Sequence, residues 1–132
     1  MANKKETVVA KTIKPAIKFV KEIAPTDKVV IVYGHDNDSI CSAVIMHKLL
    51  KVLRGTNAEL FSTKDNFSVR EEDAEEIAKM TPDKIIIVDI AHLESKHVEE
   101  ILSSNDSMII DHHQPLKLKG ITYCNPREFE KK

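Results

Sequence analysis

Three short apolar runs of the chain each end on acidic side chains, and one of them adds two consecutive histidines. The residues that follow the runs VVIVY, KIIIV and MII are Asp36, Asp38, Asp89, Asp111, His112 and His113. A single aspartate commonly caps a helix or forms a turn, and for any one of these residues alone that interpretation comes first. Acids at the ends of three separate runs favour a common chemical site instead.

The chemistry that such a group predicts is metal-assisted. Carboxylates gathered in one place repel one another unless a counter-charge joins them, and a divalent cation is the simplest counter-charge. Carboxylate and imidazole ligands without thiolates suit Mn²⁺, with Mg²⁺ or Fe²⁺ as alternatives, and disfavour a cysteine-type zinc site. Four or five such ligands with one shared carboxylate can hold two metal ions, which activate water and stabilise phosphoryl displacement.

The elements that must position these residues are visible as periodic patterns. Short apolar runs predict strands, which fall at residues 28–33, 57–62, 84–88, 107–110 and 121–124. Helical spacing of apolar residues predicts helices, which fall at residues 7–23, 39–54, 69–80 and 94–102. Pro15 should kink or split the first helix, and Gly55 should end the second.

Alternating helices and strands call for an α/β fold, a mostly parallel sheet with helices on both faces. The carboxyl ends of parallel strands meet at one edge of such a sheet, and ligands bind there. We therefore expect a strand-tip active site to which the acids of all three runs contribute. The loop at 34–38 leads into a helix N-terminus, which favours an anion such as phosphate.

Composition sets broad limits on the class of protein. A chain of 132 residues with 42% hydrophobic and 31% charged residues fits one globular domain. Its 20 basic and 21 acidic residues give a net charge of −1, and hence no general attraction for nucleic acid. Two cysteines, Cys41 and Cys124, and no signal peptide predict a cytoplasmic protein, and no apolar run predicts a membrane span.

The segments DSICSA, IIIVDIA and MIIDHHQP resemble, in this order, the first three motifs of the DHH phosphoesterase superfamily. Asn125-Pro126 is similar to the NP that follows the DHH segment in RecJ-type members, so the resemblance spans about residues 29–126. The superfamily includes RecJ-type single-strand exonucleases, nanoRNases, cyclic-dinucleotide phosphodiesterases and family II inorganic pyrophosphatases. The resemblance implies one DHH-type domain over residues 1–132, without the second, C-terminal substrate domain of the family.

The resemblance also implies a set of metal ligands. By matching position, Asp36 would bind one metal ion, Asp38 the other, and Asp89 would bridge the two, with His112 on the second ion. Members of the superfamily typically use two Mn²⁺, and Mg²⁺ is the alternative. His35 is an additional candidate ligand, because it lies one residue from the position of a metal-binding histidine in the family pattern.

Roles in catalysis and substrate binding follow from the same resemblance. Asp111 would orient a histidine and His113 would contact the scissile phosphate, so the expected catalytic residues are Asp89, Asp111 and His113. The expected substrate contacts are His113, Ser39 and Asn125.

The first motif departs from the family pattern. RecJ-type members carry H-x-D-x-D-G, whereas this chain has Gly34 at the histidine position and Ser39 at the glycine position. His35 lies one residue away, and it would either substitute for the lost histidine or point to solvent. The family also places a metal-binding aspartate downstream of the DHH motif, and no aspartate follows His113 here.

These features leave two functions open. The first is a RecJ-like, Mn²⁺-dependent hydrolase of phosphodiester bonds in single-stranded nucleic acid or short oligonucleotides. The second is a non-catalytic RecJ relative in the archaeal replicative helicase complex, with GINS and MCM proteins as partners, because those relatives also lose the first-motif histidine and glycine. Retention of Asp89 and of the full Asp111-His112-His113 motif favours metal binding.

Overall fold

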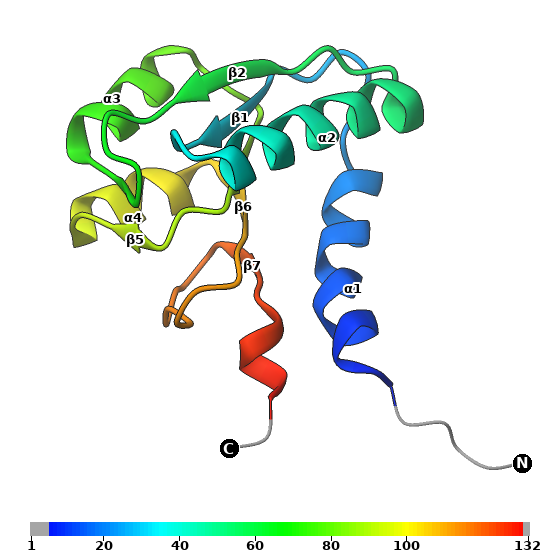
Figure 1. Ribbon diagram of the computed structural model, residues 1–132. Helices are drawn as coiled ribbons and strands as arrows, with labels where there is room; N and C mark the ends of the chain where they lie inside the picture. Colours follow the sequence, from blue (N-terminus) through cyan, green and yellow to red (C-terminus); the bar gives the residue numbers. More distant parts are fainter. Residues whose placement is uncertain (1–5, 131–132) are drawn as a thin grey trace, which may run out of the picture.

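The computed structural model describes residues 6–130, which form the alternating helices and strands of an α/β fold (Figure 1). The strands are β1 (Val29–Tyr33), β2 (Glu59–Ser62), β3 (Ser68–Val69), β4 (Lys84–Val88), β5 (His92–Leu93), β6 (Asp106–Ile110) and β7 (Thr122–Cys124). The helices are α1 (Val8–Lys21), α2 (Asn37–Arg54), α3 (Glu71–Lys79), α4 (Lys96–Ser104) and the 3-10 helix η1 (Pro126–Phe129).

Five of the strands form one parallel sheet in the order β2-β1-β4-β6-β7. The chain passes from β1 outward to β2 and then crosses back to β4, which lies on the other side of β1. The carboxyl ends of β1 and β4 therefore flank the point where the strand order reverses. In doubly wound α/β sheets this switch point is where ligands bind.

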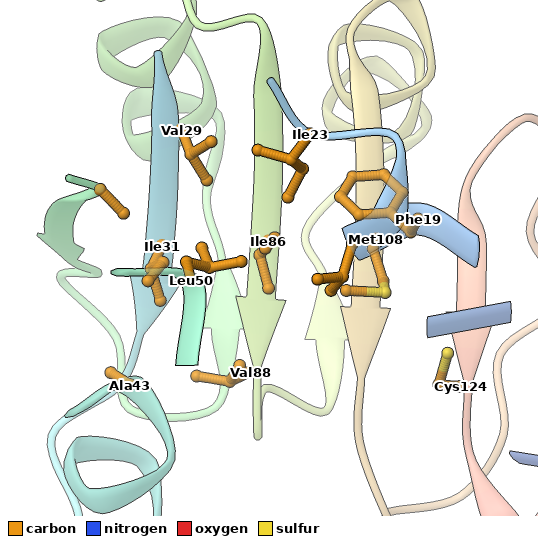
Figure 2. Packing of buried hydrophobic residues seen from close by; sticks show 12 residues of the cluster. Phe19, Ile23, Val29, Ile31, Ala43, Leu50, Ile86, Val88, Met108 and Cys124 are labelled. Carbon is orange, nitrogen blue, oxygen red and sulfur yellow. The ribbon is translucent and has the colours of Figure 1, made fainter. Parts of the chain in front are cut away.

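Helices cover both faces of the sheet, as the sequence pattern predicts. Alternate side chains of β1 point to opposite faces: Val29 and Ile31 pack with α1 and α2, whereas Val30 and Val32 pack with α3 and α4. Figure 2 shows the first of these clusters, in which Leu50 of α2 lies over the middle of the sheet. Full burial of each such aliphatic side chain stabilises the fold by about 1.5–3 kcal/mol.

Helix α2 connects the site to the rest of the fold. Asp36 caps its N-terminus, and Gly55 ends it in a left-handed conformation with φ 65°, as predicted. The helix starts at Asn37 rather than at the predicted residue 39, so Asp38 lies in its first turn and not in a loop. No helix within residues 6–130, the 18-residue α2 included, combines the length and apolarity needed to cross a membrane.

Other differences from the predicted elements are local. Helix α1 is neither split nor ended at Pro15, because the helix continues to Lys21. The predicted helix at 69–80 starts only at Glu71, since the residues before it pair with β5 in a second, two-stranded sheet. The predicted helix at 94–102 is displaced to Lys96–Ser104, because Ser95 caps it. The strands β3 and β5, of two residues each, are too short to produce a periodic signal.

Candidate metal centre at the strand tips

Four side chains at the tips of β4 and β6 form one compact group. Asp89, Asp111, His112 and His113 each offer a ligand atom, and these atoms lie within 4.8 Å of one another. The group forms because the register of the two parallel strands pairs Val88 with Ile110, which places Asp89 beside Asp111. Two of the three predicted strand tips thus converge on one site.

Asp89 combines a strained backbone with a buried carboxylate. Its φ of 56° lies in the left-handed region, which costs a residue with a side chain roughly 1 kcal/mol or more. Its Oδ1 accepts a hydrogen bond from Nε2 of His112 at 2.8 Å. Burial raises the pKa of the Asp89 carboxyl, the hydrogen bond from His112 opposes this rise, and the nearby charge of Asp36 adds to it. A bound cation would favour the ionised carboxylate that burial disfavours.

Asp111 holds His113 in place through two contacts. Its side chain is 1% exposed, and its Oδ1 accepts a hydrogen bond from Nδ1 of His113 at 2.6 Å. Its Oδ2 accepts a second one from the backbone N–H of His113 at 3.3 Å. With Nδ1 engaged by the carboxylate, Nε2 is the nitrogen of His113 left to meet a ligand.

The acids of the first motif are placed differently. Asp36 is exposed, and its Oδ1 accepts a hydrogen bond from the backbone N–H of Ser39 at 2.8 Å, so the capping interpretation holds for this residue. Its charge still acts on Asp89, and Asp38 lies on the same cleft as Asp89. Neither aspartate belongs to the compact group of four, so the ligand roles of Asp36 and Asp38 stay predictions.

His35 is exposed, as one of its two alternatives expected, and its role as a substitute metal ligand stays a prediction. Its Nε2 is hydrogen-bonded to the backbone carbonyl of Thr63, and the ring is outside the compact group. A Cβ added at Gly34 would meet the backbone oxygen of Asn66 at 2.6 Å. The side-chain Oδ1 of Asn66 accepts hydrogen bonds from the backbone N–H groups of His35 at 2.7 Å and Asp36 at 3.0 Å. The loop that carries Asn66 therefore occupies the space that a first-motif histidine would need.

The two remaining predicted substrate contacts are buried. Ser39 is 0% exposed; its Oγ accepts a hydrogen bond from the Gly34 N–H at 2.6 Å and donates one to the Val88 carbonyl at 3.4 Å. Asn125 is also 0% exposed, and its Nδ2 donates to the backbone carbonyl of His113 at 2.9 Å. Ser39 and Asn125 both hold the backbone of the motifs in position. Their burial does not support a direct contact with substrate, and that contact stays a prediction.

A cleft of about 510 Å³ opens over the tips of β4 and β6, beside the first half of α2. Asp38, Asp89, Asp111 and His112 lie on it, which makes the metal centre accessible to a small ligand. Two features here were missed from the sequence. Asn66 sits in a polar loop that gave no sign of a distant partner, and the apolar residues of α2 on this cleft read as ordinary core positions.

Comparison with known proteins gives a family for most of the chain. A family model described as "DHH family, N-terminal domain" matches residues 28–132. The matched range starts just before β1 and includes every residue of the compact group. No curated protein matches the chain.

Proposed function

The chain belongs to the DHH family of metal-dependent phosphoesterases, and we propose that it is a RecJ-like domain that hydrolyses phosphodiester bonds in single-stranded nucleic acid or short oligonucleotides. The observation that carries the proposal is the compact group of two aspartates and two histidines at the tips of β4 and β6, beside the switch point of a parallel sheet.

The donor set fits the family's metal ions. Within residues 6–130, Asp89 and Asp111 are hydrogen-bonded to His112 and His113 and form no ion pair with a lysine or arginine, so a divalent cation is a suitable counter-charge. Carboxylates and imidazoles without a thiolate suit two Mn²⁺, with Mg²⁺ as the alternative. Asp89 and His112 would hold the metal, joined by Asp36 and Asp38. When bound, the metal supplies activation of water and neutralisation of the charge on the phosphoryl group.

His113 is placed to act on the phosphate. Its Nδ1–H donates to the buried carboxylate of Asp111, which fixes the orientation of the ring. The other ring nitrogen, Nε2, is then the atom that can contact an oxygen of the scissile phosphate, and it donates a hydrogen bond there when the ring carries a second proton. Asp111 is then a positioning residue for His113, while Asn125 holds the His113 backbone from the other side.

Turnover of labelled single-stranded DNA, single-stranded RNA and dinucleotides in Mn²⁺ tests this function. Hydrolysis should be lost in Asp89→Ala and reduced about 10- to 100-fold in Asp111→Asn, the usual effect of removing a residue that orients a metal-site histidine. The matched control is Asp106→Ala, an exposed acid at the opposite end of β6. Wild-type turnover no greater than that of Asp89→Ala would rule the function out.

Two observations favour the second candidate, a non-catalytic subunit of the archaeal replicative helicase complex. The place of the first-motif histidine is filled by Asn66, and the Asp36 carboxylate caps a helix. In this case the chain would bind GINS or MCM proteins and hydrolyse nothing. Pull-down from native extract would support it if either partner were recovered, and isolation of the chain alone would count against it.

A further inference from the structure

Helix α2 is apolar on the side that faces solvent as well as on the side that faces the sheet. Its buried residues Ala43 and Leu50 pack in the core over the sheet. Its solvent side carries six large aliphatic residues that are 39–81% exposed, namely Ile40, Val44, Ile45, Leu49, Val52 and Leu53. A surface helix of a soluble domain normally presents polar residues to water, so this face of α2 lacks a partner among the described residues.

The spacing of the exposed residues indicates what kind of element would cover them. Ile45, Leu49 and Val52 follow one another at intervals of four and three residues, which is the spacing of the apolar seam of a coiled coil. Lys48 and Lys51 fall on one flank of this seam. Helix α2 contains no Phe, Tyr or Trp, the side chains that usually contact nucleobases or the membrane interface. The seam therefore suits another helix.

The charges along α2 favour a second copy of the same helix in the antiparallel direction. The one acid within α2, Asp38, lies in its first turn, whereas Lys48, Lys51 and Arg54 lie in its second half. An antiparallel copy sets the acidic end of one helix beside the basic end of the other and aligns the two helix dipoles favourably. A parallel copy would place like charges side by side.

We infer that two copies of the chain pair through α2, antiparallel, about a two-fold axis near Ile45, which lies at the middle of the helix. Such an axis makes the seam complementary to itself. Ile45 would pack against its own counterpart, and Leu49 would lie against Cys41 of the partner subunit, since both are one turn from the axis. Cys41 is exposed in the single chain, as this packing requires.

The size of the apolar patch sets the expected strength of the dimer. Together the six aliphatic residues expose the equivalent of about three whole side chains, or roughly 200–400 Å² of apolar surface per chain. Because a little over half of an interface is apolar, this patch corresponds to roughly 400–700 Å² buried per chain, below the ~800 Å² of a standard complex. We therefore expect a dimer that dissociates on dilution.

Sedimentation equilibrium of the metal-free chain tests the pairing. A dimer of twice the 14.9 kDa chain mass should form between micromolar and millimolar concentrations. Ile45→Glu should abolish the dimer, since it places two carboxylates near the two-fold axis, and should leave the monomer folded because Ile45 is 67% exposed. Val9→Glu is the matched control: Val9 is 63% exposed and lies at the N-terminal end of α1, away from α2 (Figure 1).

Disulfide crosslinking with oxidised glutathione tests the direction of the pair. In the double variant Cys41→Ser/Ile45→Cys the two introduced thiols lie near the axis and should form an interchain disulfide. In the wild type the two Cys41 residues would lie about 12 Å apart along the helix pair, beyond the ~7 Å between Cα atoms that a disulfide spans. The wild type should therefore form no crosslink through Cys41.

These measurements use neither metal nor substrate, so their outcomes are separate from those of the proposed hydrolysis. A single-chain mass at every concentration, or a dimer that survives Ile45→Glu, would overturn the inference, whatever vesicle, peptide or nucleic acid the face binds instead. A crosslink through Cys41 in the wild type would show a parallel pair and overturn the antiparallel arrangement. Absence of a crosslink in the double variant would overturn the position of the axis.

Discussion

Asp89 places an ionisable carboxyl group in a buried position, where burial favours its neutral form. Its carboxyl is buried with a raised pKa, and its backbone adopts a left-handed conformation at the end of β4. Backbone strain and buried charge both reduce stability, and they persist together mainly where function requires them. At the scale of single residues, we therefore expect the site to lower the stability of the metal-free fold and to favour metal binding.

The substitution Asp89→Asn tests whether Asp89 lowers the stability of the metal-free protein. Because the pKa of Asp89 is raised, the native state binds the proton more tightly than the unfolded chain, and stability is lost as pH rises above about 3.8. Asparagine stays neutral and tolerates the left-handed conformation. The metal-free variant should thus be more stable than wild type, by an amount that grows to the order of 1 kcal/mol as the pH rises above about 4. Urea unfolding at several pH values measures it, and a difference independent of pH would contradict it.

Asn66 is the second residue that the site depends on. It accepts two backbone hydrogen bonds of the loop that carries Asp36, from a position about 30 residues further along the chain. Asn66→Ala should loosen this loop and weaken Mn²⁺ binding about 10-fold, the lower end of the effect of removing a supporting residue. Calorimetric titration with Mn²⁺ measures the change. The exposed Asn57 gives the control variant Asn57→Ala, and equal affinities in the two variants would refute the role of Asn66.

At the scale of elements, the strands of the five-stranded sheet were predictable from the sequence, whereas the contacts between distant segments were not. The bounds of β4 match the predicted 84–88, because a run of aliphatic residues buried on both faces leaves a clear signal. The tips of β4 and β6 follow from those runs, and so does the meeting of Asp89 and Asp111. Hydrogen bonds between distant segments, such as that from the His35 N–H to the Asn66 side chain, leave no periodic pattern in the sequence, because their partners are far apart along the chain.

Asp36 caps helix α2, and we expect it to serve the metal site as well. Asparagine is as good a helix cap as aspartate, whereas alanine is not. Asp36→Ala should therefore destabilise the metal-free protein by about 1 kcal/mol, while Asp36→Asn should leave its stability nearly unchanged. Both variants should bind Mn²⁺ more weakly if Asp36 is also a ligand. Thermal unfolding with and without Mn²⁺ separates the two roles, and Mn²⁺ stabilisation of Asp36→Asn equal to that of wild type would restrict Asp36 to capping.

At the scale of the whole molecule, the fold gathers its chemistry at one edge of one sheet. Helix α1 and η1 pack together beside β7, with the Lys11 ammonium 6.0 Å from the centre of the Phe129 ring, away from the tips of β1 and β4 (Figure 1). The cleft lies over the tips of β4 and β6, next to the switch point, with α2 along one side. The arrangement explains why the three motifs, separated in sequence, meet only in the folded chain.

The most direct test of the account is the number of Mn²⁺ ions that bind to the folded chain. Titration of metal-free protein, followed by the electron paramagnetic resonance signal of free Mn²⁺, should give two ions per chain in wild type. Binding should be lost or strongly reduced in Asp89→Ala and unchanged in Asp106→Ala. Absence of Mn²⁺ binding in wild type, or equal binding in Asp89→Ala, would contradict a metal centre at the strand tips.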